Sequence, residues 1–146
     1  MSTVAEILKN KGTDVWSVSP EQSVYDAIKM MDDKGAGALA VVSQGRLAGI
    51  ISERDYARKV ILKGRSSKET RVKDIMTSHV YHTIPDDDVS SCMLVMGKHH
   101  IRHMPVLDGE SLVGMISISD VVKVIIQEQE DRIKQLEHTV TWQESY

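Results

Sequence analysis

The sequence is poor in aromatic residues and cysteine, and it has no long apolar stretch. Phenylalanine is absent and aromatic residues make up only 4% of the 146 positions, so aliphatic side chains and eight methionines must fill the core. Cys92 is the single cysteine, which excludes an internal disulfide and fits a reducing compartment. No apolar run approaches the roughly 18 residues of a membrane span, and residues 1–12 lack the apolar core of a signal peptide. We therefore expect a soluble cytoplasmic protein with no membrane partner.

The charge balance and the missing motifs exclude several function classes. The net charge is −3, whereas a protein whose main partner is a nucleic acid carries a basic face. Gly35 and Gly37 follow a predicted helix and precede a predicted strand, which reverses the order of a dinucleotide-binding fingerprint. The sequence has no P-loop and no side-chain pair or triad typical of acid–base catalysis. We expect a protein that is not an enzyme and does not bind nucleic acid.

What the sequence does contain is an internal repeat. Residues 15–61 align without a gap on residues 80–126, so that GIISERD at 49–55 matches GMISISD at 114–120. The identical pairs include Val24/Val89, Gly49/Gly114, Ser52/Ser117 and Asp55/Asp120. Most of the other pairs exchange one apolar residue for another. A match of this length indicates a duplicated structural unit.

The similarity extends upstream of this match. VAEIL at 4–8 resembles VKDIM at 72–76, once three extra residues at 10–12 are allowed for. Each half has roughly 60 residues and would be marginally stable alone, so we expect the halves to pack together about a pseudo-twofold axis. The predicted units are a first repeat at 8–63, a linker at 64–71, a second repeat at 72–128, and a C-terminal helical extension and tail at 129–146.

Each copy shows the same order of predicted elements. Apolar residues recur at i, i+3, i+4 and i+7 from Val24 and from Val89, a spacing typical of one face of an amphipathic helix. We expect Pro20 and Pro85 in the first turns of these helices and Gly35 at the end of the first one. The strands predicted next are 38–42, 47–52, 104–107 and 112–117, and the closing helices cover 53–62 and 118 onward. The order is strand–helix–strand–strand–helix, twice, in an α+β fold.

The linker and the C-terminal extension are predicted from their polarity. Residues 63–70 are polar and basic, which favours a solvated connection between the copies. Apolar residues recur from Val122 to Val140 and predict a helix to about residue 138. About 20 residues of helix span on the order of 30 Å, which is longer than one copy needs to cover itself. We therefore expect this helix to contact a second subunit of a homodimer, with Trp142 and Tyr146 as anchors.

The repeated Ser-x-x-Asp motif has two interpretations. Ser52 lies where a strand gives way to a helix and Asp55 follows three residues later, which is the pattern of a capping box worth roughly 1 kcal/mol. Capping does not explain Gly49, because a glycine weakens a strand unless something approaches its backbone closely. A helix N-terminus also binds phosphate, and a carboxylate can accept both hydroxyls of a ribose. The motif therefore favours a nucleotide site, with helix capping alone as the alternative.

The residues carry a resemblance to a known family. The paired Gly-h-h-Ser-x-x-Asp motifs (h, apolar), the preceding GALAVV and IRHMPVLD segments, and the proline-initiated helices resemble a tandem pair of CBS domains, a Bateman module. The resemblance covers roughly residues 4–126. It implies a non-catalytic regulatory module with two clefts between the copies. Such clefts bind adenosyl ligands, namely AMP, ADP, ATP, S-adenosylmethionine or NAD(H).

The resemblance also implies which residues line each cleft. Asp55 and Asp120 would hold ribose, and Ser52 and Ser117 would lie near ribose and phosphate. The implied adenine-binding residues are Ser19, Ala36, Gly37 and Ala38 for the Asp120 cleft, and Ile84 and Ile101 for the Asp55 cleft. The implied phosphate-binding residues are Arg54, Arg58, Arg102 and His103 at the Asp55 cleft, where the Asp120 cleft has Ser119 and Lys123. Because the arginines favour one cleft, equal occupancy of the two is not expected.

Two other interpretations were weighed against this one. His99 and His103 are four residues apart and would share a face of a helix, as metal ligands do. However, the apolar pattern places His103 near the start of a strand, and no Cys or carboxylate completes a ligand set, so we expect no metal. The second alternative is a dimerisation or protein-interaction scaffold that has no nucleotide ligand. The favoured hypothesis is an adenine-nucleotide sensor that acts in trans on a regulated partner, which the sequence does not identify.

Overall fold

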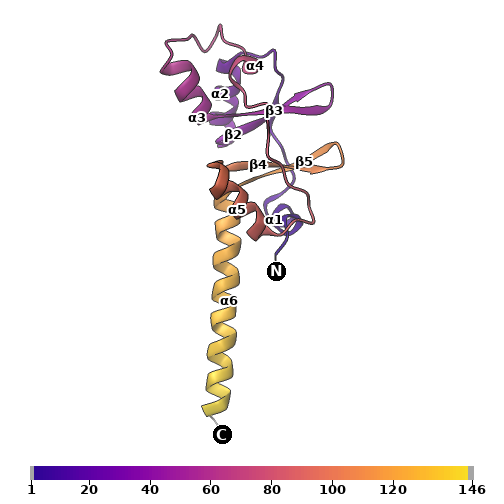
Figure 1. Ribbon diagram of the computed structural model, residues 1–146, viewed down its shortest axis with the longest axis vertical. Helices are drawn as coiled ribbons and strands as arrows, with labels where there is room; N and C mark the ends of the chain where they lie inside the picture. The colour runs from indigo at the N-terminus through magenta and orange to yellow at the C-terminus, as the bar shows by residue number, and fades with distance from the viewer. Residues whose placement is uncertain (1, 145–146) are drawn as a thin grey trace.

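The protein consists of two small sheets with helices packed on them and one long helix that leaves the body (Figure 1). In the computed structural model the backbone is described for residues 2–144 and the side chains for residues 2–138. The helices are α1 (Val4–Lys11), α2 (Val24–Lys34), α3 (Glu53–Tyr56), the π-helical turn η1 (Ala57–Ile61), α4 (Val72–Ile75), α5 (Val89–His99) and α6 (Ile118–Glu144). The strands are β1 (Ser17–Val18), β2 (Ala38–Ser43), β3 (Arg46–Ser52), β4 (His103–Asp108) and β5 (Ser111–Ser117).

The two predicted hairpins form in equivalent registers. β2 pairs antiparallel with β3 so that Ala38 lies opposite Ser52, and β4 pairs antiparallel with β5 so that His103 lies opposite Ser117. The strand expected before the first helix differs between the copies. In the first copy β1 pairs parallel with β2, whereas among the described residues the second copy has only a single bridge from Thr83 at that place. The hairpins are confirmed, and the first strand is confirmed in one copy only.

The first helix of each copy begins later than the prolines suggested. The side chain of Ser23 accepts a hydrogen bond from the Asp26 backbone N–H at the start of α2, and Asp88 caps α5 in the same way. Pro20 and Pro85 therefore lie in the turns before the helices, not in their first turns, because the capping side chains determine where the helices begin. The helix end at Gly35 is confirmed, since this residue adopts the left-handed conformation with φ 63°.

Each half of the chain contributes a helix to the hydrophobic core of the other half. The core around α5, β4 and β5 includes Val4, Ile7 and Leu8 of α1. The core around α2, β2 and β3 includes Val72 and Ile75 of α4. In Figure 1 α1 accordingly lies beside α5 and α4 lies near α2. The similar segments 4–8 and 72–76 are thus equivalent helices that are exchanged between the two copies.

This exchange explains the glycines of the repeated motif. A Cβ atom added at Gly114 would lie 2.5 Å from Cδ2 of Leu8, on α1. A Cβ atom added at Gly49 would lie 2.7 Å from the carbonyl oxygen of Thr77 and 2.9 Å from Sδ of Met76, just after α4. The close approach that these glycines permit is made by the exchanged segments of the chain. These two glycines therefore give no support for a ligand close to the strand backbone.

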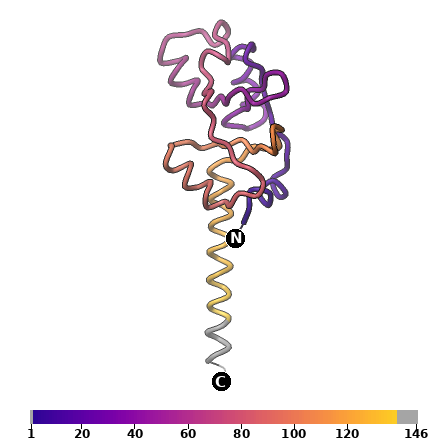
Figure 2. The backbone as a smooth tube through the Cα atoms, turned by 45° about the vertical axis from the view of Figure 1, so that its right-hand side comes forward, coloured from indigo at the N-terminus to yellow at the C-terminus, as the bar shows by residue number. Residues whose placement is uncertain are grey.

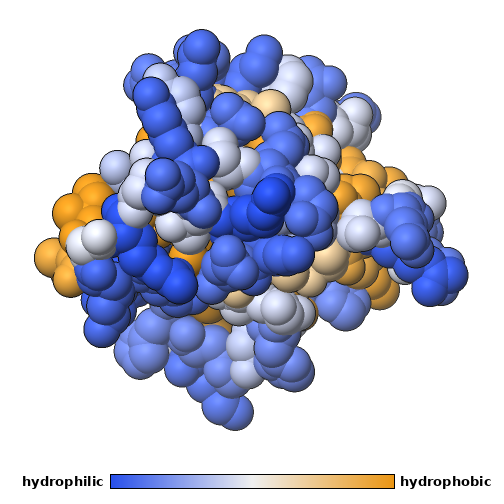
Figure 3. All heavy atoms as spheres, turned by 90° about the horizontal axis from the view of Figure 1, so that it is seen from above, coloured by the Kyte–Doolittle hydropathy of each residue, from blue (hydrophilic) through white to orange (hydrophobic). Residues whose placement is uncertain are grey.

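The linker is docked on the first copy and is not a wholly solvated connection. The backbone N–H groups of Val24 and Tyr25 donate to the carbonyl oxygens of Thr70 and Ser67, both 2.9 Å away. These N–H groups belong to the first turn of α2 and have no partner within that helix, so the linker satisfies them. Thr70 is buried as a result. Figure 3 looks onto this end of the molecule, where hydrophilic residues cover most of the surface.

The two closing helices differ in regularity and length. The predicted helix 53–62 is the short α3 followed by η1, a π-helical turn. The predicted helix from 118 onward is confirmed as α6, which continues to Glu144 and projects from the body (Figures 1 and 2). No helix within the described residues is both long and apolar enough to cross a membrane. The predicted anchors Trp142 and Tyr146 lie outside the residues whose side chains are described.

Candidate functional site

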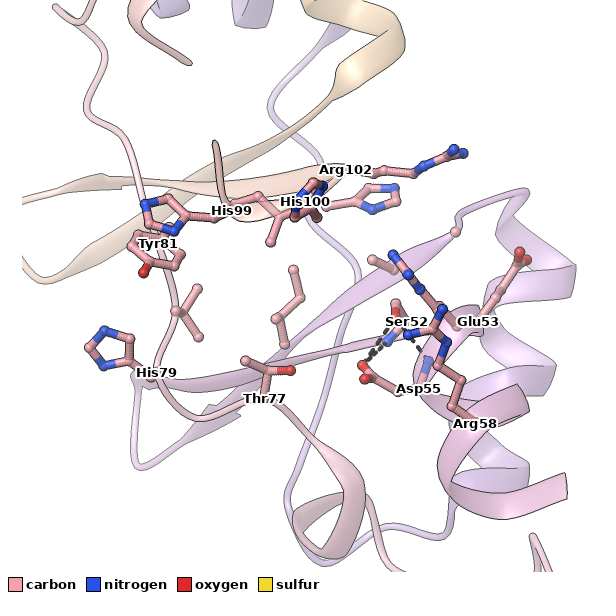
Figure 4. A pocket seen from close by; sticks show the side chains of 17 residues that line it. Ser52, Glu53, Asp55, Arg58, Thr77, His79, Tyr81, His99, His100 and Arg102 are labelled. Carbon is pink, nitrogen blue, oxygen red and sulfur yellow. Dashed lines mark hydrogen bonds between the residues drawn. The ribbon is translucent and has the colours of Figure 1, made fainter. Parts of the chain in front are cut away.

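A cleft of about 810 Å³ lies between the two copies. One wall is the corner at which β3 of the first copy ends and α3 begins, and another is the segment from the end of α5 to the start of β4 in the second copy (Figure 4). The chain segment that follows α4 closes one side. The lining residues fall in the segments 37–38, 50–58, 77–81 and 99–103.

The corner of the first copy is held by reciprocal hydrogen bonds between Ser52 and Asp55. The backbone N–H and the hydroxyl of Ser52 both donate to Oδ2 of Asp55 at 3.0 Å, and the backbone N–H of Asp55 donates to Oγ of Ser52 at 3.2 Å. Nζ of Lys59 lies 3.2 Å from Oδ1 of Asp55. The capping box is therefore present, and its members also line the cleft. Capping and ligand binding are compatible at this corner.

Basic side chains outnumber acidic ones along the cleft. Arg54 and Arg58 come from the first copy and Arg102 comes from the second. The acidic lining residues are Glu53 and Asp55. Four of the six histidines of the chain also line the cleft, namely His79, His99, His100 and His103. A cleft with this charge favours an anionic ligand, and arginine is well suited to bidentate contacts with phosphate.

Aromatic rings form the side of the cleft across from the Ser52 corner (Figure 4). The rings of Tyr81 and His99 are stacked with centroids 4.0 Å apart and planes 18° apart, and His79 meets Tyr81 edge-on at 5.6 Å. The sequence analysis did not select Tyr81. The repeat alignment contained a signal, because it pairs Tyr81 with Trp16 and His99 with Lys34. Nζ of Lys34 lies 4.3 Å from the Trp16 ring, so the aligned positions form equivalent contacts in both copies.

The predicted site residues do not all lie in this cleft. Those that line it are Ser52, Arg54, Asp55, Arg58, Ile101, Arg102 and His103. Gly37 and Ala38, which were assigned to the Asp120 cleft, line the Asp55 cleft. Ile84 is not among the lining residues of this cleft and is exposed. Ala36 packs against the core of the first copy, and the backbone N–H of Ser19 donates to Oε1 of Gln22. The ligand contacts assigned to all these residues stay predictions.

The corner of the second copy has a partner that the sequence analysis did not foresee. The backbone N–H of Ser117 donates to Oδ2 of Asp120 at 2.8 Å. Nζ of Lys11, at the end of α1, donates to the same oxygen at 2.6 Å and to the carbonyl oxygen of Met115 at 2.8 Å. Lys11 belongs to the three extra residues 10–12 that interrupt the repeat, which was the only sequence signal for it. Lys123 was named for this corner instead, and Ser119 lies in the first turn of α6.

Burial and these contacts shift the pKa values of Asp120 and His103. Burial alone would raise the pKa of Asp120, but the hydrogen bonds from Lys11 and Ser117 together outweigh it and hold this pKa below its usual value. Burial lowers the pKa of His103, and the charge of Lys11 lowers it further. Lys11 is thus close enough to both groups to affect their charge. The charge nearest to the Asp120 carboxylate is therefore the ammonium group of Lys11, from the same chain.

The two histidines considered as metal ligands do not share a helix face. His99 ends α5 and stacks on Tyr81, whereas His103 begins β4. Within the described residues no three or more His, Cys, Asp or Glu side chains are grouped so that they could hold a metal ion. The predicted place of His103 near the start of a strand is confirmed, because the chain turns between these two residues.

Residues 4–62 and 72–127 each match the sequence model of the CBS domain. The chain belongs to the CBS-domain family. It is 40% identical over 145 residues to "CBS domain-containing protein CBSX3, mitochondrial" of Arabidopsis thaliana, covering 92% of this chain and 70% of the relative. It is 51% identical to a proposed signal-transduction protein with CBS domains from Burkholderia ambifaria, with a TM-score of 0.84, covering 88% of this chain and 96% of that one. The predicted fold of two CBS repeats is confirmed.

A more distant CBS pair has been solved with adenosyl ligands. The CBS domain pair of protein MJ0100 was determined in complex with 5′-methylthioadenosine and S-adenosyl-L-methionine. It is 24% identical to this chain with a TM-score of 0.78, and the match covers 88% of this chain and 98% of that one. At this identity the likeness concerns the fold of the two CBS pairs.

Proposed function

We propose that this CBS protein is a non-catalytic regulatory module that binds an adenine nucleotide and signals to a partner protein in trans. The ligand class comprises AMP, ADP, ATP, S-adenosylmethionine and NAD(H). The observation that carries this proposal is the 810 Å³ cleft, which combines the Ser52–Asp55 corner of one copy with Arg102 and His103 of the other. Such a cleft meets the usual description of a small-molecule site, which is concave and has a few converging polar groups.

Each part of the ligand has a partner of suitable chemistry in this cleft. The carboxylate of Asp55 is an acceptor for the two ribose hydroxyls, and its hydrogen bonds to Ser52 keep it in position. Arg54, Arg58 and Arg102 supply positive charge for phosphates. Apolar lining for the adenine comes from Ala38, Ile50 and Ile101. A nucleotide bound in this way would contact both CBS repeats at once.

The Asp55 cleft is proposed to fill first. At the other corner Oδ2 of Asp120 already accepts hydrogen bonds from Lys11 and from the backbone of Ser117. A ribose bound to Asp120 would have to compete with the Lys11 ammonium group for this carboxylate. Nζ of Lys59 likewise lies 3.2 Å from Oδ1 of Asp55 and donates to the carbonyl oxygen of Ile75 on α4. The preference for the Asp55 cleft therefore rests on Arg54, Arg58 and Arg102, which line it.

Signalling would follow from the position of the cleft between the copies. A ligand can shift a conformational equilibrium only by its difference in affinity for the two states. A nucleotide that contacts the α3 corner and the 99–103 segment together favours the orientation in which both walls can reach it. The surface offered to a partner would change with that orientation. We also expect a homodimer and a cytoplasmic location; the Arabidopsis relative is mitochondrial by name.

Thermal unfolding tests this proposal. A ligand at about 100 times its dissociation constant adds roughly 2.7 kcal/mol to the free energy of unfolding, which raises the melting temperature by about 5–10 °C for a chain near this size. We expect this shift with at least one of AMP, ATP, NAD, NADH and S-adenosylmethionine. Asp55→Asn should abolish it, since the asparagine oxygen can still accept the Ser52 backbone N–H but the charge that accepts both hydroxyls is lost.

The alternative is a dimerisation or interaction scaffold that has no nucleotide ligand. It is favoured by the hydrogen bonds that already satisfy both motif aspartates within the chain. If none of the five compounds shifts the melting temperature at millimolar concentration, the scaffold is the better account. A shift that Asp55→Asn leaves unchanged would place the ligand elsewhere and would also contradict the proposal.

A further inference from the structure

The second half of α6 lies outside the body of the protein. Ser2 N–H donates to Oε1 of Glu128 at 2.7 Å, and every described side chain from 129 to 138 is exposed. Figures 1 and 2 show this part of the helix projecting well away from both sheets. Most helical stability in proteins comes from packing of an apolar face against another surface. An apolar stripe on this exposed part of α6 would gain stability from such a surface.

The projecting helix carries an apolar stripe at the spacing of a coiled coil. Ile126, Ile133 and Leu136 are 53%, 53% and 61% exposed, although they are large apolar residues. Their spacing of seven and three residues places the isoleucines at heptad positions a and the leucine at position d. Val122 and Gln129 occupy the two preceding d positions. Among parallel coiled coils, β-branched residues at a with leucine at d, as at Ile133 and Leu136, favour two strands.

The stripe lies beside the face of α6 that packs on the body. Val121 is fully buried against the second core. At about 100° per residue, Ile126, Ile133 and Leu136 lie about 60–140° around the helix axis from Val121. A second helix can therefore lie along the stripe without displacing the body from α6. The apolar stripe continues beyond the body, where Ile133 and Leu136 lie in the exposed segment 129–138.

The charges that flank the stripe favour one orientation of the second helix. Glu130 and Glu137 occupy e positions and Arg132 occupies a g position. In a parallel pair, Arg132 of one chain lies opposite Glu137 of the other, because g pairs with the e position five residues further along. In an antiparallel pair e faces e, which would place glutamates opposite one another. The charge pattern thus complements a parallel copy of the same helix.

We propose that α6 pairs with α6 of a second copy of this chain in a parallel coiled coil along Ile126, Ile133 and Leu136. The two bodies then lie at the same end of the coiled coil, each with its own cleft. The inference specifies the surface and orientation of the expected homodimer and does not depend on nucleotide binding. A failure of nucleotide binding would leave it intact.

The mass of the full-length chain in solution tests the surface. By analytical ultracentrifugation at micromolar concentration, the wild type should have the mass of two chains. The double variant Ile133→Asp with Leu136→Asp should have the mass of one chain. The control is Leu94→Asp on α5, which changes an even more exposed apolar residue of the body and should leave the dimer intact. Circular dichroism should show that all variants remain folded. A monomeric wild type, or a dimer lost only in Leu94→Asp, would overturn the proposal.

Disulfide cross-linking tests the orientation. In a Cys92→Ala background, Leu136→Cys places a thiol at a d position, where the two copies of a parallel coiled coil come close together. We expect air oxidation to give a covalent dimer on a non-reducing gel. An antiparallel pair would instead cross-link only when chains carrying Leu136→Cys and Ile126→Cys are mixed. That result would contradict the parallel arrangement.

Discussion

The two strand-to-helix corners of this CBS protein share a reciprocal pair of capping hydrogen bonds but differ in their surroundings. In both, a backbone N–H of serine donates to an aspartate three residues later. The Asp55 corner opens on a large cleft lined by arginines and aromatic rings. At the Asp120 corner, Nζ of Lys11 lies 2.6 Å from the carboxylate. A duplicated motif has thus kept its capping geometry while its neighbours have diverged.

The divergence arises from the exchange of helices between the copies. Because α1 packs in the second core, the residues that follow it reach the Asp120 corner. The equivalent helix α4 packs in the first core, but it is followed by Met76 and Thr77, which carry no charge. The three extra residues 10–12 therefore supply the ammonium group at the Asp120 corner, whereas Lys59 of η1 supplies it at the Asp55 corner.

The largest effect is expected from the two motif glycines. Gly49→Ala should lower the free energy of unfolding by about 2–3 kcal/mol, because its Cβ would meet the backbone oxygen of Thr77, which cannot move without shifting the chain. Gly114→Ala should cost about 1 kcal/mol, since its Cβ meets the side-chain end of Leu8, which can change rotamer. Urea unfolding of both variants measures the difference. Equal losses would show that the exchanged segments do not differ in rigidity.

A smaller effect is expected from the arginines of the Asp55 cleft. Arg58→Gln should weaken binding of a phosphate-bearing nucleotide about tenfold, which is about 1.4 kcal/mol, because a hydrogen bond between charged groups is lost. Lys123→Gln removes a positive charge near the other corner and serves as the matched control. Titration with ATP followed by intrinsic fluorescence or calorimetry gives both affinities. Equal weakening by the two changes would mean that the nucleotide does not distinguish the corners.

The smallest effect is expected from the ion pair at the second corner. The pKa of Asp120 is held below its ordinary value of 3.8, so this group stabilises the fold above that pH, and the contribution is lost as the pH falls through the lowered pKa. Lys11→Met should therefore cost up to about 1 kcal/mol at pH 7, as expected for a half-exposed pair. The difference from the wild type should vanish towards pH 2. A pH-independent difference between the two proteins would assign the loss to packing.

Much of the fold could be predicted because its signals are local. The apolar periodicity from Val24 and Val89 and the short apolar runs of the hairpins arise within single elements. The exchange of α1 and α4 could not be predicted, because the partner of Leu8 lies more than 100 residues away at Gly114. The same holds for the first strand of the second copy, which within the described part of the chain is reduced to one bridge at Thr83.

The candidate site also contains residues that local sequence signals predicted and residues that they did not. Ser52, Arg54, Asp55 and Arg58 lie in one short segment whose motif can be recognised from the sequence. His79 and Tyr81 were missed because they belong to no motif, although the alignment of Tyr81 with Trp16 pointed to that position. Lys11 was missed because it reaches Asp120 only through the packing of α1 on the other copy.

Calorimetric titration of the wild type, Asp55→Asn and Asp120→Asn with each of AMP, ATP and NAD tests the central claim most directly. We predict that at least one nucleotide binds the wild type, with one molecule per chain at its tightest site. That site should be lost in Asp55→Asn and kept in Asp120→Asn. Tight binding that survives Asp55→Asn and disappears in Asp120→Asn would contradict the claim, because it would move the primary nucleotide site to the corner that Lys11 contacts.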